Sequence, residues 1–461
     1  MTEQIYLAEK AWLNGRWQNN VCMQVDEQGL ISSLTTNEGS PPEAIRLKGY
    51  VLPGMPNCHS HAFQRGFAGL SEYQANPSDS FWTWRSIMYQ FVSEMTPEQL
   101  FTIARQLYLE MLQAGYSSVA EFHYLHQGPG GERHANPAEM SEAIIAAAKE
   151  TGIGLTLLPV YYRYAGFGNK APTEGQLRFT HEPEEYFALL EHLNQKLLDS
   201  SNMTLGIAPH SLRAVSPEDI NEAVAVLHGL DDKAPVHIHI AEQTQEVDDC
   251  LAAVGARPVE YLLNECTVDD RWCLIHATHL SDEEIERLAA SQAVAGLCPT
   301  TEANLGDGVF PAVDYLKSDG RIAVGSDSHI SVNMLEELRI LEYSQRLFHR
   351  RRALIASEAR SSVGETLYFE SLKGGAQCMN RPSGSLEEGK LADFICLDPE
   401  HPSLVGKPDQ YLLDSLIFSV SDSPIIANYV AGRCVYNKEN SEPLRTSTLA
   451  FKQVLESLIG R

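Results

Sequence analysis

The chain has 461 residues, enough for two to four domains or for one large barrel with additions. It carries 35 lysines and arginines against 61 aspartates and glutamates, a formal net charge of −26. Such a surface repels phosphate backbones and anionic lipid, so we expect neither nucleic acid nor a membrane as a partner. Nine cysteines without a Cys-x-x-Cys pair, and a first segment without an apolar signal-peptide core, favour a reduced, cytoplasmic protein.

Eight short apolar runs, each followed by a helical pattern, succeed one another along most of the chain. They span residues 49–61, 117–126, 152–162, 203–212, 234–243, 271–280, 293–304 and 321–329. Several lack alternation, which is typical of parallel strands covered on both faces. Helix starts between them are marked by Thr96-Pro97-Glu98-Gln99, Asn136-Pro137, Ser216-Pro217 and Ser281-Asp282-Glu283-Glu284. The pattern predicts an α/β fold, a (β/α)₈ TIM barrel over residues 49–379.

The two ends of the chain have a different pattern. Residues 1–48 and 380–440 contain strand-like pieces separated by turns, and each set is too small to bury a core alone. We therefore predict one small β-sandwich domain built from the N- and C-terminal segments together. Residues 441–461 are expected to form a C-terminal helix.

Histidines and carboxylates gather at the ends of four predicted strands. His59 and His61 end the first strand and face the same side, because residues i and i+2 of a strand do so. The others are His237, His239 and Glu242 at the fifth strand, His276 and His279 at the sixth, and Asp327 and His329 at the eighth. The carboxyl ends of barrel strands meet at one face, where catalytic groups collect, and imidazoles at this spacing can hold a divalent ion.

This arrangement resembles the amidohydrolase superfamily, and the segment "GSLEEGKLADFICLD" (384–398) is similar to that superfamily's C-terminal segment. The resemblance covers nearly the whole chain. It implies the ligand set His59, His61, His239 and Asp327, with His276 beside the bound water. We expect a structural role for His237, which lies deeper in its strand. His279 and His329 lie past the strand ends and are weak candidates for supporting the ligands from outside.

The number of metal ions follows from a missing lysine. Two-metal members of the superfamily usually place a bridging carboxylated lysine at the end of the fourth strand. Here no lysine occurs between Lys196 and Lys233, and the fourth strand ends in "APHSLRAV". We therefore expect one divalent ion, with zinc as the first choice and Fe²⁺ as the alternative.

The reaction class follows from the residues around that ion. A zinc ion held by three imidazoles and a carboxylate lowers the pKa of its bound water toward about 7. Glu242 lies three residues after His239, and this spacing resembles the deaminase branch, in which the glutamate protonates a C=N group. The predicted catalytic residues are therefore Glu242 as proton donor to nitrogen, with His276 and Asp327 orienting and deprotonating the water.

Five further polar residues surround the expected barrel mouth. They are Gln64, Arg85, Tyr124, His210 and Arg213. Two arginines suit a small dicarboxylate substrate, because the guanidinium fork grips carboxylates in a bidentate manner. The segments "MPNCHSHAFQRGFAGL", "FWTWR", "EFHYLH", "GIAPHSLRAV" and "HIHIAEQ" are similar to the branch that deiminates N-formimino-L-glutamate in bacterial histidine breakdown. The resemblance implies that these five residues bind that substrate, that N-formyl-L-glutamate and ammonia are released, and that the enzyme is a homodimer.

Two alternatives remain open at this stage. A related deaminase could act on a purine or another aromatic ring, such as a guanine- or adenosine-type substrate, with Trp82 and Trp84 stacking on it. A protein of another class, an amidohydrolase-like barrel that persists as a scaffold, would have lost its ligands. The presence of all four expected ligands and of His276 argues against the scaffold.

Overall fold

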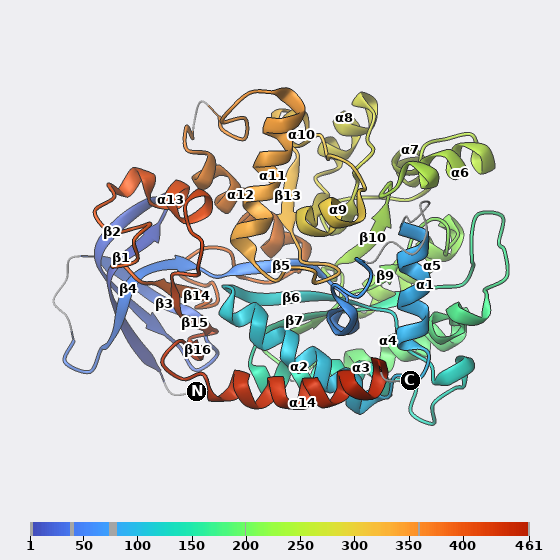
Figure 1. The fold of residues 1–461 in the computed structure, drawn as a ribbon, viewed down its shortest axis with the longest axis horizontal. Helices are drawn as coiled ribbons and strands as arrows, with labels where there is room; N and C mark the ends of the chain where they lie inside the picture. Colours follow the sequence, from blue (N-terminus) through green and yellow to red (C-terminus); the bar gives the residue numbers. More distant parts are fainter. Residues whose placement is uncertain (1–2, 37–40, 73–80, 199, 358–359, 460–461) are drawn as a thin grey trace.

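Two parallel sheets form the centre of the computed structural model, which describes residues 3–36, 41–72, 81–198, 200–357 and 360–459, without the side chains of 81–83 (Figure 1). One has the order β5-β6-β7-β8, with β9 paired to β7, and the other has the order β10-β11-β12-β13. Their strands are β5 (Met55–Ser60), β6 (Tyr116–His123), β7 (Gly154–Tyr161), β8 (Met203–Leu205), β9 (Ala208–Pro209), β10 (Val236–Ile240), β11 (Trp272–His276), β12 (Val294–Leu297) and β13 (Arg321–Val324). Each of the eight predicted runs overlaps one of these strands, or two in the case of the fourth run.

Single bridges join the two sheets into a ring. Ile207 pairs in parallel with Val236 on one side, and Ser60 pairs in parallel with Asp327 on the other. The N–H of Asp327 donates to the carbonyl oxygen of His59 at 3.0 Å, so the eighth strand position lies against the first. The predicted α/β fold of the TIM-barrel class is confirmed, with isolated bridges rather than long ladders at the two seams.

Helices follow the strands, and most begin where the sequence predicts. In α2 (Pro97–Gln113), Thr96 and Gln99 form the expected capping box, and Ser216 and Ser281 cap α5 (Pro217–Leu230) and α8 (Asp282–Ser291). The exception is α3 (Glu139–Thr151), which begins two residues after Pro137. The other helices are α1 (Phe81–Val92), α4 (Pro183–Leu197), α6 (Thr244–Val254), α7 (Pro258–Glu265), α9 (Pro299–Leu305), α10 (Ala312–Lys317), α11 (Met334–His349), α12 (Val363–Cys378), α13 (Leu412–Phe418) and the short 3₁₀ helices η1 (Ala62–Phe67), η2 (Pro129–Gly131), η3 (Glu174–Phe179) and η4 (Asp409–Tyr411).

The two ends of the chain form a single seven-stranded sheet beside the barrel (Figure 1). Its order is β16 (Arg433–Asn437), β15 (Ile425–Val430), β14 (Phe394–Leu397), β4 (Ile45–Pro53), β1 (Gln4–Leu13), β2 (Arg16–Val25) and β3 (Ile31–Thr36). A bridge between Leu30 and Leu391 brings the β3 edge close to the residues before β14, so the sheet bends over on itself. The sequence predicts a β-sandwich from the two chain ends, whereas the structure has one continuous sheet, with its own cluster of buried apolar side chains.

The small sheet and the barrel share one stretch of backbone. Strand β4 ends at Pro53, and β5 begins at Met55 after the single residue Gly54. A side chain at Gly54 would lie 2.7 Å from the Cβ of Ser117, so only glycine fits at this crossing. The C-terminal helix α14 (Glu442–Ile459) runs along the outside of α2 (Figure 1).

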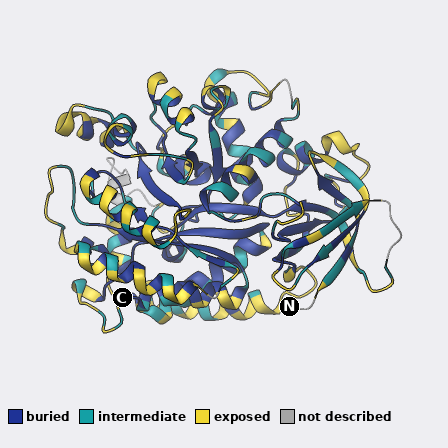
Figure 2. Ribbon diagram, turned by 180° about the vertical axis from the view of Figure 1, so that it is seen from behind, coloured by how far each residue is buried: buried dark blue, intermediate teal, exposed yellow. Residues whose placement is uncertain are grey.

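Burial follows the layers of the fold. The barrel strands are dark throughout Figure 2, whereas the surrounding helices are exposed only on their outer faces. Every residue of β5, β6, β7, β10, β11 and β12 is buried, including the histidines at their carboxyl ends. Within the described residues, no helix combines the length and the apolar character that crossing a bilayer requires.

Candidate metal centre and active site

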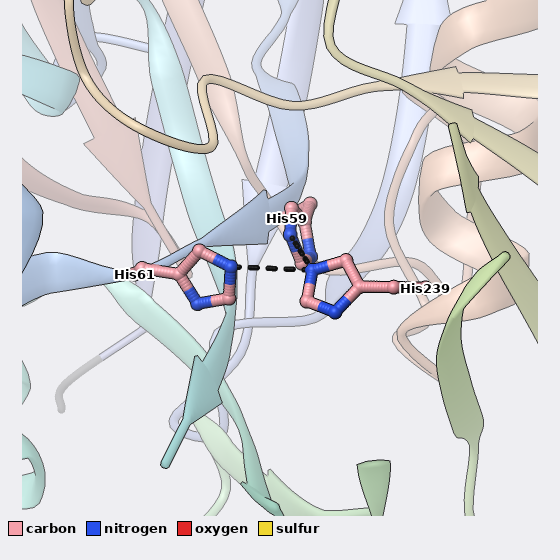
Figure 3. A group of neighbouring side chains, drawn as sticks. All are labelled: His59, His61 and His239. Carbon is pink, nitrogen blue, oxygen red and sulfur yellow. Dashed lines mark hydrogen bonds between the residues drawn. The ribbon is translucent and has the colours of Figure 1, made fainter. Parts of the chain in front are cut away.

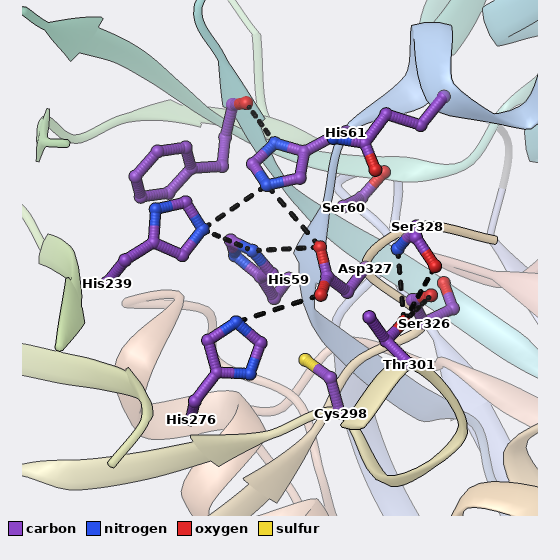
Figure 4. Close-up of polar contacts among 12 residues, drawn as sticks. His59, Ser60, His61, His239, His276, Cys298, Thr301, Ser326, Asp327 and Ser328 are labelled. Carbon is purple, nitrogen blue, oxygen red and sulfur yellow. Dashed lines mark hydrogen bonds and ion pairs between the residues drawn. The ribbon is translucent and has the colours of Figure 1, made fainter. Parts of the chain in front are cut away.

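Four side chains from three strand ends converge on one point (Figures 3 and 4). The Nε2 atom of His239 lies 3.0 Å from that of His59 and 3.3 Å from that of His61. The Oδ1 atom of Asp327 lies 3.5 Å from the Nε2 of His59 and 3.4 Å from the Nε2 of His61. The structure therefore brings together the four residues that the sequence predicts as ligands.

The spacing of these atoms fits a tetrahedral cation site. Ligands bound at about 2.0–2.1 Å from a tetrahedral zinc ion lie about 3.3 Å from one another. His61 Nδ1 is 2.9 Å from the carbonyl oxygen of Phe122, and His239 Nδ1 is 3.2 Å from that of His210. Each Nδ1 thus donates its hydrogen to a carbonyl, which leaves two Nε2 lone pairs facing each other. No hydrogen bond can join two lone pairs, whereas a cation between them satisfies both.

The electrostatics keep the imidazoles neutral, as metal ligands must be. Burial and the neighbouring His59 lower the pKa of His61 to about 3. Burial, followed by the proximity of other histidines, also holds the pKa values of His59 and His239 well below the usual value. These rings therefore offer lone pairs over the whole physiological pH range.

A second layer of polar groups fixes the ligand-bearing segments. His329 Nε2 lies 3.2 Å from Ser60 Oγ, and its Nδ1 lies 3.0 Å from Ser326 Oγ. Ser60 stands between the two histidines of the first strand, and Ser326 precedes Asp327. Ser60 also donates to the buried carboxylate of Glu121 at 2.6 Å. His329 therefore does not reach the metal centre but ties its two backbone segments together.

Two other histidines singled out by the sequence lie away from the centre. His237 Nε2 donates to the carbonyl oxygen of Cys378 at 2.7 Å, deeper in the barrel. His279 Nε2 donates to the carbonyl oxygen of Asp307 at 2.8 Å. Both make structural hydrogen bonds to backbone.

Three strand ends carry non-glycine residues in the left-handed backbone region. Ala241 has φ 51°, His276 has φ 67° and Asp327 has φ 45°. Such conformations cost about 1–3 kcal/mol each and persist only where the surrounding structure imposes them. Here they turn the chain sharply at the carboxyl ends of β10, β11 and β13, next to the centre.

A pocket opens over the metal centre, and three of the four ligands, His61, His239 and Asp327, line it. It is lined by His61, Gln64, Trp84, Arg85, Met88, Tyr124, His210, Arg213, His239, Glu242, His276, Leu305 and Asp327. All predicted catalytic and substrate-binding residues are in this lining. Trp84 lines it too, whereas the side chain of Trp82, the other expected stacking residue, lies outside the described residues.

Glu242 and His276 lie side by side next to Asp327. His276 Nε2 is 3.7 Å from Glu242 Oε1 and 3.7 Å from Asp327 Oδ2. Burial, together with repulsion from Asp327 and Glu246, raises the pKa of Glu242 to about 7. Burial lowers the pKa of His276, but the carboxylates of Glu242, Glu302 and Asp327 outweigh it and raise the value to about 10. The site thus holds a carboxyl group and an imidazole that can both exchange protons with a substrate.

The rest of the pocket lining carries hydrogen-bonding and cationic groups. Gln64 Nε2 donates to Tyr124 Oη at 3.0 Å, and Arg85 Nη2 donates to Tyr162 Oη at 3.0 Å. Arg213 Nε lies 4.0 Å from Glu246 Oε1. Burial, followed by the charges of both arginines, holds the pKa of His210 well below its usual value. This lining therefore presents two guanidinium groups and neutral hydrogen-bonding partners.

Sequence reasoning missed four residues that support this site. They are Tyr162 beside Arg85, Glu246 beside Arg213, and Glu302 and Asp307 near His276. Glu302 Oε1 lies 3.3 Å from His276 Nδ1 and accepts the N–H of Cys298 at 2.8 Å. The sequence did carry a signal for Glu302. Pro299 marks a helix start, which places Glu302 in the first turn of the helix that follows the seventh strand.

Comparison with known proteins shows the family to which this chain belongs. The sequence pattern of the amidohydrolase family matches residues 50–435, which is most of the chain. The chain belongs to the amidohydrolase family. This confirms the superfamily that the strand-end motifs predict.

Similar proteins agree with this amidohydrolase assignment. A formimidoylglutamate deiminase of Pseudomonas aeruginosa is 48% identical over 452 residues, which cover 98% of this chain and 99% of that protein. A 5-methylthioadenosine/S-adenosylhomocysteine deaminase of Bacillus cereus is 28% identical over 411 residues, 87% of this chain and 86% of its own. The crystal structure of an amidohydrolase from Brucella melitensis is 43% identical, with a TM-score of 0.92 over 99% of this chain and 100% of that one. An adenosine deaminase structure from Xanthomonas campestris with bound zinc, at 20% identity, TM-score 0.80 and 98% coverage of both chains, shares the fold.

Proposed function

We propose that this amidohydrolase hydrolyses N-formimino-L-glutamate to N-formyl-L-glutamate and ammonia. The observation that carries the proposal is the 48% identity to the formimidoylglutamate deiminase of P. aeruginosa along 98% of the chain. The geometry supports it, because one pocket combines a cation site, two proton-transfer groups and two arginines. The enzyme is then a hydrolase that acts on the C–N bond of an amidine.

We assign the ligand role to His59, His61, His239 and Asp327, with zinc as the first choice of ion and Fe²⁺ as the second. A bound zinc ion supplies a water molecule of lowered pKa at neutral pH. One ion suffices, because the four ligand atoms surround one point and the described lining of the pocket contains no lysine to bridge a second ion in the usual way.

The protein's own groups then move the protons. Asp327 accepts the proton of the attacking water as it adds to the formimino carbon, and His276, which the neighbouring carboxylates hold in its protonated form, donates a hydrogen bond that orients this water. Glu242 gives its proton to the nitrogen as the C=N bond becomes single, takes a proton from the hydroxyl group on the tetrahedral carbon, and passes it to the nitrogen as ammonia leaves. The proton that Asp327 took from the water then restores the acid form of Glu242. With a pKa of about 7, its carboxyl group populates both protonation states at neutral pH, which is what alternating donor and acceptor steps need. The products are an N-formyl group and ammonia.

The pair of arginines gives the substrate its orientation. Arg85 and Arg213 would each bind one carboxylate of the glutamate moiety, because charge-assisted guanidinium–carboxylate bonds are directional. Gln64, Tyr124 and His210 line the same pocket and complete the binding surface. Gln64 Oε1 is buried without a hydrogen-bond partner among the described residues, so it is available to accept an N–H of the substrate.

Replacing Arg213 by Ala is expected to lower kcat/KM for N-formimino-L-glutamate by about 10–100-fold, because a hydrogen bond to a charged group contributes about 1.5–3 kcal/mol. Most of the loss should appear in KM, since the carboxylate is bound equally in substrate and transition state. Steady-state ammonia release measures it. Arg445→Ala, at a side chain that is 70% exposed on α14, is the matched control and should not change kcat/KM. A ring-deaminating enzyme would keep its activity toward a neutral purine in the Arg213 variant, and that result would favour the alternative substrate class.

Glu302 is a positioning residue in this proposal, and its replacement by Leu is expected to lower kcat by about 10–100-fold. The physical reason is that His276 Nδ1 loses its acceptor, so the ring no longer presents Nε2 to the pocket. KM should change little, and Glu302→Gln, which keeps an acceptor oxygen, should recover most of the rate. Equal losses in both variants, or a loss confined to KM, would contradict the positioning role.

The compartment, the oligomeric state, the pathway and the partners are proposals of the same kind. We infer a cytoplasmic homodimer that works in histidine breakdown and takes a small dicarboxylate, with neither nucleic acid nor a membrane as partner. The net charge of −26 and the family resemblance support this inference. Sedimentation equilibrium tests the dimer, and a monomer at micromolar concentration would contradict it.

A further inference from the structure

A second group of metal-binding side chains lies beside the four ligands and shares none of them. Glu242, His276 and Asp307 each offer one ligand atom, and these atoms lie within 4.8 Å of one another. All three side chains are buried. Two of them line the pocket, so the group is open to small solutes from that side.

The donor atoms in this group are free to bind a cation. His276 Nδ1 donates to Glu302, and its Nε2, which lies 3.7 Å from Glu242 Oε1, becomes a ligand atom when a cation displaces its proton. Asp307 is only 4% exposed, and its Oδ2 has no hydrogen-bond partner among the described residues, while its Oδ1 accepts from Gln243. A buried carboxylate oxygen without a partner is costly, and a cation removes that cost.

The local charge also favours a cation. The His276 ring interacts electrostatically with four carboxyl groups, those of Glu242, Glu302, Asp307 and Asp327. Two carboxylates and one imidazole form a donor set that suits zinc and related divalent ions. Because Asp307 and Glu242 are not fixed by the four-ligand centre, such a site would be weaker than the first and would fill only at higher metal concentration.

We propose that Glu242, His276 and Asp307 form a second divalent-cation site whose occupancy inhibits the enzyme. An ion bound there displaces the proton from His276 Nε2 and takes an oxygen of Glu242, so it blocks both the group that orients the water and the group that protonates the nitrogen. It also occupies the place of the formimino nitrogen, so inhibition competes with substrate. The inhibition rests on the proposed function, whereas the binding of the second ion does not.

Equilibrium dialysis against zinc tests the binding directly. The wild-type protein should bind one tight ion and, at higher zinc concentration, a second one. Asp307→Asn should bind the second ion at least tenfold more weakly, because a neutral amide replaces the carboxylate. Asp314→Asn, which makes the same change at an exposed residue of α10 paired with Lys317, should bind two ions as the wild type does. Should Asp307→Asn fail to fold, Glu242→Gln provides the same loss of a donor for the dialysis measurement.

Ammonia release provides the second readout. Zinc added beyond one equivalent should inhibit the wild type, and the inhibition should weaken as N-formimino-L-glutamate is raised. In Asp307→Asn, the inhibition constant, measured relative to that variant's own uninhibited rate, should rise at least tenfold. A single ion at saturating zinc, or an unchanged second affinity in Asp307→Asn, would overturn the second site. Two ions bound by a protein that releases no ammonia from the substrate would instead overturn the proposed function and leave the second site standing.

Discussion

Replacing Glu242 by Gln is expected to lower kcat by about 10²–10⁴-fold, the usual contribution of a general acid–base group. Gln has nearly the same shape but cannot give a proton to the departing nitrogen. Because Glu242 is not one of the four ligands, the tightly bound metal should remain at one equivalent. Steady-state ammonia release and metal analysis of the same sample check both parts.

Two comparisons make this result specific to Glu242. Glu283→Gln changes an exposed residue of α8 in the same way and should leave turnover unchanged. Near-normal turnover in Glu242→Gln would refute its role as the proton donor. A loss of activity that accompanies loss of the tight ion would show that Glu242 acts through the metal centre instead.

Replacing His239 by Ala is expected to weaken metal binding and to lower the activity together. His239 Nε2 is the ligand atom that lies 3.0 and 3.3 Å from the other two imidazoles, so its loss opens one side of the site. A structural zinc ion contributes about 10–16 kcal/mol, or about 3 kcal/mol for each of four ligands, which corresponds to a loss in metal affinity of about 10²-fold. Competition with a chelator of known affinity measures the change.

The control for this variant is His192→Ala, at a half-exposed histidine of α4 that makes no contact with the centre. Its metal affinity and turnover should equal those of the wild type. An unchanged metal affinity in His239→Ala would contradict the ligand assignment, even if the activity fell.

The barrel could be predicted because the signals for its strands and helices each lie within a short stretch of sequence. Each buried strand is a short apolar run, and each following helix has its own capping residues, as Thr96 and Gln99 show. The small sheet was less predictable, because its central pairing joins Pro53 to Phe394 and no local pattern encodes a partner so far along the chain. The predicted strand run at 293–304 was too long. The strand ends at Leu297, and Pro299, inside the predicted run, starts a helix.

The candidate site divides in the same way. Strand periodicity and the common carboxyl edge of the barrel predicted that histidines and carboxylates would gather there, and the family resemblance selected His59, His61, His239 and Asp327 among them. The residues that contact this site from loops and from the following helices could not be predicted, because the sequence does not show which loop folds back to the pocket. Asp307 is an example, as it follows α9 and reaches the Glu242–His276 pair only through the tertiary fold. Beyond the strand ends the sequence pattern does not predict where a side chain points. The structural roles of His279 and His329 are therefore seen only in their hydrogen bonds.

The most direct test is ammonia release by the zinc-loaded protein from N-formimino-L-glutamate, compared with formimino-aspartate, guanine and adenosine under identical conditions. We predict rapid release from N-formimino-L-glutamate and little or none from either purine, because the pocket pairs its cation site with two arginines. Release from a purine with none from N-formimino-L-glutamate would contradict the account.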